Sequence, residues 1–321
     1  MRGSPFGFNM QPVNDNLHQY NMLTFKEIEL TDKPLIDKYL EGNTYRASDF
    51  CFSNLFCWKD KFKTEFAVNE NWLFVRFRDN VDRNSYLMPF GKGNLPEAVQ
   101  LIKEDAAGIG CKFQIRGLTQ RMCDELEEAM PGAFAFKLNR SVSDYIYTSE
   151  KLIHLTGKKL QSKRNHINRF NRENQWEYKS LTNNPELVKE CRGMLYNWME
   201  KNGEDEDESL YYDNIATRLM LDNFEYLGLR GGVICVDGQM AAFSLGAPLT
   251  RDTFDVHVEK ALADNFNGAY SIMNQQFVLN EASNFTYINR EEDMGIESLR
   301  KAKLSYYPDI LLEKFVARET E

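Results

Sequence analysis

Cysteine is scarce in this sequence and follows no pattern. The chain has 6 cysteines in 321 residues, none in a CxxC pair and none at the spacing of zinc ligands. We therefore expect reduced, mostly buried thiols rather than a disulfide framework or a cysteine-based zinc site. Cys51 and Cys57 stand among aromatic residues in FCFSNLFCW, which predicts a core helix.

Long apolar runs are also missing. No stretch reaches the roughly 18 consecutive apolar residues that a transmembrane helix needs. Residues 1–21 are polar and aperiodic and lack the apolar core of a signal peptide. The sequence therefore predicts a cytoplasmic protein without a transmembrane segment, in which residues 1–21 form a flexible leader or a non-native remnant.

What the chain does contain is enough apolar sequence for two globular domains. Its hydrophobic content is 42% and its charged content 27% in 37.4 kDa, as in soluble folded proteins. The net charge of -9 argues against a protein that coats nucleic acid with its whole surface. A local basic site is compatible with this balance.

The order of elements predicts two mixed α/β units. The runs TEFAV, NWLFVRFR and SYLMPFG indicate an antiparallel meander, and Asp237-Gly238 between two apolar runs predicts a two-residue hairpin. We expect a first domain over 22–140 and a second over 141–321, each a largely antiparallel sheet flanked by helices. A meander followed by strand, glycine-containing loop, helix and strand is similar to the order in the GNAT acyltransferase superfamily.

Carboxylates are absent between Glu150 and Glu173, within a segment predicted to be a helix over 157–174. On a helical wheel, apolar Leu160, Ile167 and Phe170 lie opposite most of the basic side chains. One interpretation is a solvated helix face; the other is a site for phosphate from RNA, a nucleotide or a lipid head group. The basic residues are Lys158, Lys159, Lys163, Arg164, Arg169 and Arg172.

A second candidate segment is ADNFNGAYS, between a predicted strand and a helix. GNAT enzymes place a glycine-rich loop here to hold the pyrophosphate of coenzyme A, and only Gly268 and Ala269 resemble that loop. These two residues are the candidates for cofactor binding.

The strand FDVHVEK offers candidates for proton transfer. Alternation predicts Asp255, His257 and Glu259 on one face of the strand, where two carboxylates flank an imidazole. Such a polar face is more often free of metal than metal-bound, so we predict no metal and treat His257 and Glu259 as catalytic candidates.

A third segment, residues 287–308, joins a strand end to a helix, where ligands collect in α/β folds. Acidic residues, Glu292 among them, precede the helix and basic residues follow, an order that helix capping also explains. Glu292 is the catalytic candidate here. The candidates for substrate binding are Asn289, Arg300, Lys303 and Tyr306.

The segments DYIY (144–147), LTGKKLQSKRNHINRF (155–170) and NREEDMGIESLRKAKLSYYP (289–308) together resemble a bacterial family of unknown function allied to the C-terminal domain of phosphatidylglycerol lysyltransferases. The resemblance extends from about Phe25 to the C-terminus. It implies two tandem GNAT-like domains, as in Fem peptidyltransferases. The membrane-spanning portion of the lysyltransferases is not found in this sequence, so a lipid acceptor would be reached at the membrane surface.

The resemblance implies aminoacyl transfer from aminoacyl-tRNA to an amine or hydroxyl acceptor, such as an anionic lipid or a small molecule. Lys163, Arg164 and Arg169 would then contact phosphates of the tRNA or of an anionic substrate. One alternative is an N-acyltransferase that uses acyl-coenzyme A. The other is a non-catalytic module that binds an anion or a partner protein.

Overall fold

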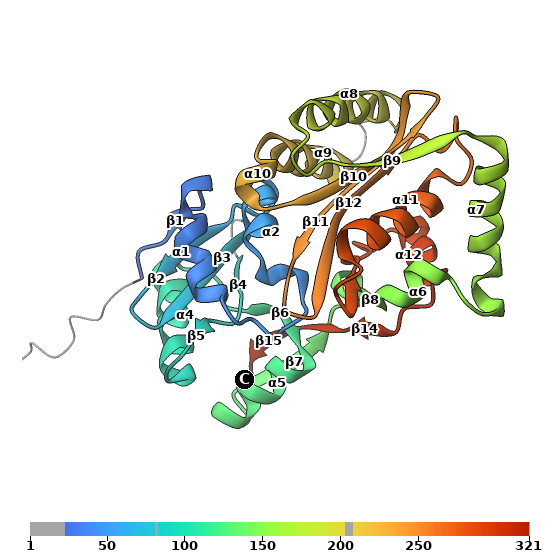
Figure 1. Ribbon diagram of the computed structural model, residues 1–321. Helices are drawn as coiled ribbons and strands as arrows, with labels where there is room; N and C mark the ends of the chain where they lie inside the picture. Colours follow the sequence, from blue (N-terminus) through green and yellow to red (C-terminus); the bar gives the residue numbers. More distant parts are fainter. Residues whose placement is uncertain (1–22, 81–82, 203–207, 321) are drawn as a thin grey trace, which may run out of the picture.

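The computed structural model describes residues 23–80, 83–202 and 208–320, so the predicted leader over 1–21 lies outside the described residues. Two lobes, each built on one sheet with helices packed against it, lie side by side (Figure 1). This confirms the predicted fold class of two mixed, largely antiparallel α/β units. Among the described helices, none combines the length and apolar character needed to cross a bilayer.

The first sheet contains the predicted antiparallel meander, in which β2 pairs with β3 and β3 with β4. Its strand order is β1-β2-β3-β4-β6-β15-β7, and β5 pairs with β3. The strands are β1 (Lys26–Glu27), β2 (Glu65–Val68), β3 (Trp72–Asn80), β4 (Arg83–Tyr86), β5 (Phe90–Gly91), β6 (Ile115–Thr119), β7 (Phe134–Leu138) and β15 (Lys314–Glu319). The helices of this lobe are α1 (Lys33–Leu40), α2 (Phe52–Cys57), α3 (Lys59–Phe62), α4 (Leu95–Gly108) and α5 (Gln120–Ala129).

The second sheet has the order β14-β8-β13-β12-β11-β10-β9. Its strands are β8 (Asp144–Thr148), β9 (Trp176–Ser180), β10 (Arg230–Val236), β11 (Gln239–Pro248), β12 (Thr253–Ala261), β13 (Tyr287–Asn289) and β14 (Ile310–Leu312). Its helices are α6 (Ser149–His154), α7 (Gln161–Glu173), α8 (Pro185–Asn202), α9 (Glu208–Asp222), α10 (Phe224–Leu227), α11 (Ala269–Phe277) and α12 (Glu297–Leu304). The predicted hairpin is confirmed, because Asp237 and Gly238 join β10 to β11 with φ of 50° and 81°.

A parallel strand pair defines one end of the second sheet. After β12 the chain passes through α11 and returns as β13, which pairs in parallel with β12. The pairing joins Thr253–Asp255 to Tyr287–Asn289 and ends there. In α/β folds, ligands bind at the carboxyl ends of parallel strands. We therefore expect a functional site at the segments that follow Asp255 and Asn289.

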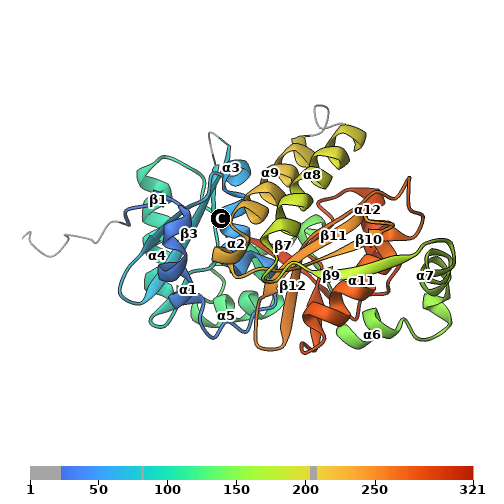
Figure 2. The same cartoon turned by 45° about the horizontal axis from the view of Figure 1, so that its top comes forward.

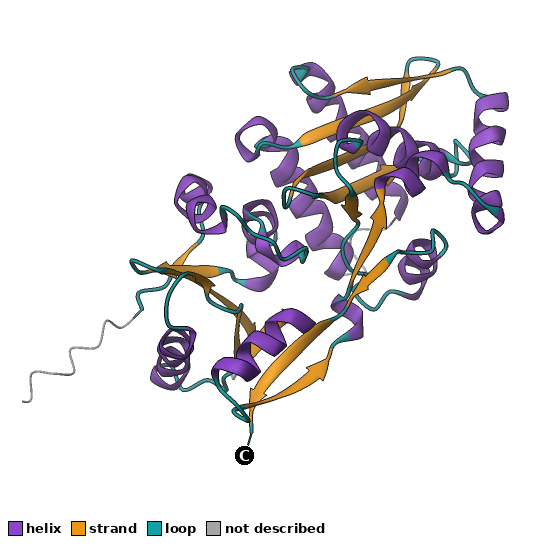
Figure 3. Cartoon of the chain, turned by 60° about the horizontal axis from the view of Figure 1, so that its bottom comes forward, coloured by secondary structure: helices purple, strands orange, loops and turns teal. Residues whose placement is uncertain are grey.

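The C-terminal segment differs from the prediction. The second domain was expected to extend to residue 321, but the run ILLEKFVA near the chain end forms two strands in two sheets. β14 pairs with β8 in the second sheet, whereas β15 pairs with β6 and β7 in the first (Figures 1 and 3). The chain end therefore ties the two lobes together, while the predicted division near residue 140 stays a prediction.

The two lobes share apolar packing. One buried cluster extends from the first lobe, with Phe56 of α2, to Met220 of α9 and Phe243 of β11. Figure 2 shows α8 and α9 next to each other at the junction of the lobes, close to α2. A second cluster lies between the other face of the second sheet and α11 and includes Phe254 and Phe277. Because α2 packs at this junction, side chains from the first lobe can reach the second sheet.

Candidate functional site at the junction of the two lobes

A cavity of about 610 Å³ lies at the junction of the two lobes. The first lobe lines it with α2 and its neighbours, and the second with β12, α9, α11, α12 and the loop after β13. Its aromatic lining includes Trp58, Trp198, Tyr270 and Tyr306. Its charged lining residues are Asp49, Arg116, Lys163, Asp213, His257, Glu259, Lys260, Arg290, Glu291, Glu292 and Lys303.

A β-bulge in β12 changes the side of the sheet on which part of the predicted polar face lies. Leu245 of β11 pairs with Val258 and the next residue, Gly246, pairs with Val256, so His257 is the extra residue. Gly246 allows this, because a Cβ there would lie 2.3 Å from the backbone oxygen of Asp255.

The expectation that Asp255, His257 and Glu259 share one face is therefore wrong for Glu259. Glu259 accepts a hydrogen bond from Asn274 of α11, on the same side as Phe254 and its neighbour Phe277. The next residue, Lys260, pairs with Asp213 of α9. Strict alternation fails because the bulge reverses the side-chain direction for the rest of the strand.

Glu259 and Arg290 form a largely buried ion pair at the edge of the cavity. The Nε and Nη2 atoms of Arg290 lie 3.0 and 2.5 Å from Oε2 of Glu259. Although burial opposes the charge on the guanidinium, Glu259 raises the pKa of Arg290. Nη1 of Arg290 is buried and has no hydrogen-bond partner among the described residues.

Tyr306, predicted to bind substrate, lies between two cations. Its ring centroid is 4.9 Å from the guanidinium of Arg290 and 4.2 Å from Nζ of Lys163. Burial, with a further contribution from Arg290, lowers the pKa of Lys163. Lys163, Glu259 and Tyr306 thus lie together around Arg290. An anionic group bound here would be stabilised by the two cations.

Glu292 lies in the same cavity next to a buried lysine. Nζ of Lys314 is 2.6 Å from Asp49, 2.8 Å from Asp144 and 4.0 Å from Glu292. Burial raises the pKa of Glu292 to about 7, and Lys314 opposes part of that rise. A carboxyl group with a pKa near neutrality is suited to take or give a proton at physiological pH.

His257 lies beside two other carboxylates. Its Nδ1 is 2.9 Å from Oε1 of Glu291 and 3.6 Å from Oδ2 of Asp255. The imidazole is fully buried, with 0% of the side chain exposed. Its Nε2 has no hydrogen-bond partner within the described part of the chain. The catalytic role predicted for His257 stays a prediction.

Three residues predicted to bind substrate make hydrogen bonds within the protein. Nδ2 of Asn289 donates to the backbone of Arg46 and to Asp144, at 2.8 and 2.9 Å. Arg300 makes two hydrogen bonds of 2.8 and 2.9 Å to Asp293. Lys303 lines the cavity, but its Nζ donates to the carbonyl oxygens of residues 290 and 292, both at 2.5 Å. Asn289 and Arg300 are not among the residues that line the cavity.

The predicted basic helix is α7, preceded by a short 3-10 turn at Lys158–Leu160. Only Lys163 of its three candidate phosphate contacts lines the cavity. Arg164 donates to the backbone oxygens of Leu155 and Gly157, and Arg169 pairs with Glu173 at 2.9 Å. The basic residues of α7 therefore do not form one phosphate site with the cavity.

Gly268 caps the N-terminus of α11 at the point where α7 crosses it. Its φ is +93°, and a Cβ would lie 2.8 Å from the backbone oxygen of His166 in α7. The neighbouring Ala269 is fully buried, and neither residue lines the cavity. Gly268 thus permits close packing of two helices, and the predicted cofactor binding by Gly268 and Ala269 stays a prediction.

We expect Gly268→Ala to lower the free energy of unfolding by about 1–3 kcal/mol, because left-handed backbone strain and a steric clash add together. Urea denaturation measures the change. The matched control is Gly228→Ala, which has φ of +71° and no atom within 4 Å of the added Cβ. Equal losses in the two variants would contradict a packing role for Gly268.

Several residues that line the cavity were not predicted as site residues from the sequence. Arg290 and Glu291 stand within the acidic and basic cluster that the sequence shows, but nothing local indicates that they pair with Glu259 and His257. Trp58 comes from the other lobe, and its aromatic surroundings predicted only a core helix.

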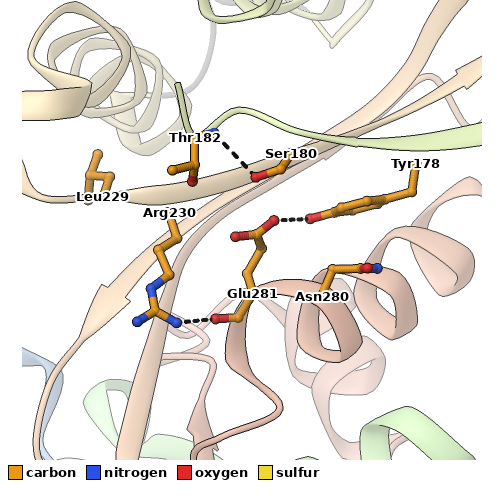
Figure 4. A pocket seen from close by; sticks show the side chains of 7 residues that line it. All are labelled: Tyr178, Ser180, Thr182, Leu229, Arg230, Asn280 and Glu281. Atoms are coloured by element: carbon orange, nitrogen blue, oxygen red, sulfur yellow. Dashed lines mark hydrogen bonds between the residues drawn. The ribbon is translucent and has the colours of Figure 1, made fainter. Parts of the chain in front are cut away.

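A second hollow lies on the second lobe, away from these residues. Figure 4 shows Tyr178 donating to Glu281 and Arg230 donating to the backbone oxygen of Glu281, at 2.9 and 2.5 Å. The remaining lining residues are Ser180, Thr182, Leu229 and Asn280. Because Arg230 and the carboxylate of Glu281 each already have a hydrogen-bond partner here, this hollow offers less chemistry than the cavity between the lobes.

Comparison with known proteins agrees with the resemblance predicted from sequence. A conserved protein of unknown function from Bacteroides thetaiotaomicron, solved by crystallography, is 39% identical, with a TM-score of 0.87 over 93% of this chain and 100% of that one. The structure of L-PGS from Bacillus licheniformis is 16% identical, with a TM-score of 0.61 over 89% of this chain and 91% of that one, and shares the fold.

An uncharacterized protein of Mycoplasmoides gallisepticum is 23% identical over 184 residues. That match spans 56% of this chain and 58% of that protein, so little more than half of the curated relative is covered. The family model "Phosphatidylglycerol lysyltransferase, C-terminal" matches residues 43–318. The chain therefore belongs to the family of phosphatidylglycerol lysyltransferase C-terminal domains, and the predicted resemblance is confirmed.

Proposed function

We propose that the protein is an acyltransferase that moves an aminoacyl group from aminoacyl-tRNA to an amine or hydroxyl acceptor in the cavity between the lobes. The observation that carries the proposal is Glu292, a carboxyl group with a pKa of about 7 inside a cavity of about 610 Å³. The family name adds a lysyl group and phosphatidylglycerol as the first donor and acceptor to test.

The chemistry needs little beyond position and one proton acceptor. An aminoacyl ester is already activated, so the enzyme must hold the acceptor close, remove its proton and stabilise the developing oxyanion. In the proposal, Glu292 takes the proton as the acceptor attacks the ester carbonyl. The proton passes on to the tRNA 3′ oxygen as the ester bond breaks, which balances the reaction.

The proposed site for the negative charge of the donor is the pair of cations around Tyr306. Lys163 is 4.2 Å from the ring of Tyr306, and Arg290 has a buried Nη1 without a partner in the described residues. Glu259, held by Arg290, would position that guanidinium rather than accept a proton. A phosphate or ester oxygen in this place would satisfy Nη1.

The acyl-coenzyme A alternative places a pyrophosphate at Gly268 and Ala269. Backbone atoms of α7 pack 2.8 Å from where a Cβ of Gly268 would stand. Because α7 occupies one side of this loop, less of the loop is open to a pyrophosphate. This favours aminoacyl-tRNA over acyl-coenzyme A as the donor. The cytoplasm, where charged tRNA is found, is the compartment that the proposal requires.

The direct test is a transfer assay with purified protein, a labelled aminoacyl-tRNA pool and either phosphatidylglycerol vesicles or small amines. Transfer of label to one acceptor supports the proposal. Transfer only from acetyl-coenzyme A would favour the alternative, and tRNA binding without turnover would favour a binding module.

We expect Lys163→Ala to weaken tRNA binding about tenfold and to reduce the slope of log affinity against log salt by about 1, as for the loss of one phosphate contact. Filter binding at several salt concentrations measures both. The matched control is Lys159→Ala, since Lys159 stands outside the cavity lining in the turn before α7. If both variants lose affinity equally, Lys163 acts only through general surface charge.

A further inference from the structure

Three side chains that bind metals in other proteins meet beneath the cavity. Cys51 comes from the first lobe, where it is the N-cap of α2, and Asp255 and His257 come from β12. Each offers one ligand atom, and these atoms all lie within 4.8 Å of one another. The zinc site proposed below departs from the prediction of no metal at Asp255 and His257, because the third residue, Cys51, comes from the other lobe and its sequence position gives no sign of this contact.

The carboxylate of Asp255 is the strongest indication that something binds here. Asp255 is fully buried, and neither of its carboxylate oxygens has a hydrogen-bond partner in the described structure. Nε2 of His257, also buried, lacks a partner there as well. Native proteins rarely leave a buried carboxylate without any compensating group, because the lost hydration is costly.

Nearby lysines do not contact the carboxylate of Asp255. Lys314 is held by Asp49 and Asp144 at 2.6 and 2.8 Å. Lys303 donates to backbone carbonyl oxygens of the loop. No ion pair to Asp255 from a lysine or arginine occurs among residues 23–80, 83–202 and 208–320. A bound cation would supply the positive charge that this carboxylate lacks.

We propose that Cys51, Asp255 and His257 bind a zinc ion that joins the two lobes beneath the cavity. Thiolate, imidazole and carboxylate together are a ligand set typical of zinc, with bonds of about 2.0–2.3 Å. Donor atoms bound to one tetrahedral centre at such distances lie about 3.3–3.8 Å apart, so zinc binding would draw these side chains together from their present separation of up to 4.8 Å. The evidence for zinc binding does not depend on the proposed transfer reaction, although His257 belongs to both sites.

Glu291 contacts the imidazole of His257 and would orient it as a zinc ligand. It lies 2.9 Å from Nδ1 of His257, which leaves Nε2 as the nitrogen without a partner in the described chain. A carboxylate on one ring nitrogen orients the imidazole of many metal ligands and increases its basicity. The zinc ion would thereby fix His257 and Glu291, which both line the cavity.

The test measures metal binding rather than activity. Protein stripped with a chelator is titrated with zinc by calorimetry, and bound metal is counted by mass spectrometry after dialysis. Cobalt is then added in place of zinc, since a cobalt–thiolate bond gives a charge-transfer absorption in the near ultraviolet. We expect one equivalent of zinc per chain and the cobalt–thiolate band.

Cys51→Ala is expected to remove the cobalt–thiolate band and to weaken zinc binding by at least about 100-fold, since loss of a ligand exceeds the effect of an outer-shell change. Cys57→Ala, a buried thiol in the same helix and outside the set, is the matched control and should bind zinc normally. Asp255→Asn, which keeps the shape of the side chain, should also weaken binding. Sub-stoichiometric zinc in the unaltered protein, or binding unchanged in Cys51→Ala and Asp255→Asn, would overturn the proposal and leave water as the partner of Asp255.

Discussion

Glu292→Gln is expected to lower the rate constant of acyl transfer by about 10²–10⁴-fold, the usual contribution of a positioned general base. The amide keeps the size of the side chain but cannot accept the proton of the attacking acceptor. Single-turnover transfer from labelled donor measures the loss, with donor binding measured separately. Binding should change little, because the proposed contacts with the donor are made by Lys163 and Arg290.

The pH dependence of the transfer rate is a second test of the role of Glu292. Burial raises the pKa of Glu292 to about 7, and only the deprotonated carboxylate acts as a base. The transfer rate of the unaltered protein should therefore rise with pH through about 7, and the residual rate of the Gln variant should lack that step. The matched control is Glu297→Gln at an exposed position in the first turn of α12. A Gln variant that keeps both the full rate and the pH step would exclude Glu292 as the base.

The same pKa shift has a consequence for stability. Because the folded state raises the pKa of Glu292 above its ordinary value, folding favours the protonated carboxyl. Its contribution to the free energy of unfolding is complete below the ordinary pKa of a glutamate and is lost as pH rises through about 7. The stability of Glu292→Gln relative to the unaltered protein should therefore increase over this range.

Lys314→Met is expected to lower the free energy of unfolding by about 3–5 kcal/mol, the usual loss when one partner of a buried ion pair is removed. Lys314 begins β15, and only 1% of its side chain is exposed. Without it, the buried carboxyl group of Asp144 and its neighbour Asp49 would have no ammonium group beside them. Chemical denaturation measures the loss, and β15 would be the strand expected to leave the first sheet.

A double variant separates charge from packing in this cluster. Lys314→Met combined with Asp144→Asn should recover part of the lost stability, since the amide removes the uncompensated charge. The matched control is Lys137→Met, an exposed lysine on the neighbouring strand β7, which should change stability by less than about 0.5 kcal/mol. A small loss in Lys314→Met, equal to that of the control, would show that the buried ion pair of Lys314 with Asp144 does not stabilise the fold.

Local features of the fold were predictable from the sequence. The hairpin at Asp237-Gly238, the basic helix that became α7, and the meander of the first sheet each depend on residues within one short segment. The same is true of the motifs that carried the family resemblance. Glu292 was also predictable as a candidate, because it stands in a charged cluster between a strand and a helix.

The site itself was decided by contacts between distant segments. Lys163, Arg164 and Arg169 are alike in the sequence, yet only Lys163 lines the cavity, because the other two bind groups of their own lobe. The bulge at His257 placed Glu259 on the opposite face from the one that alternation predicts. Neither outcome has a local signal, since each depends on which neighbour packs against the element.

By itself, then, the sequence determined the fold class, the family and the segments that carry chemistry, because these depend on periodicity, turn residues and short motifs. Only the tertiary structure decided which charges are paired. It placed Cys51 of one lobe beside Asp255 and His257 of the other, and it divided the C-terminal segment between two sheets with Lys314 at the crossing. Ion pairs and ligand sets form between side chains that the fold brings together. The number of residues between two side chains in the sequence does not determine how close they lie in the folded protein.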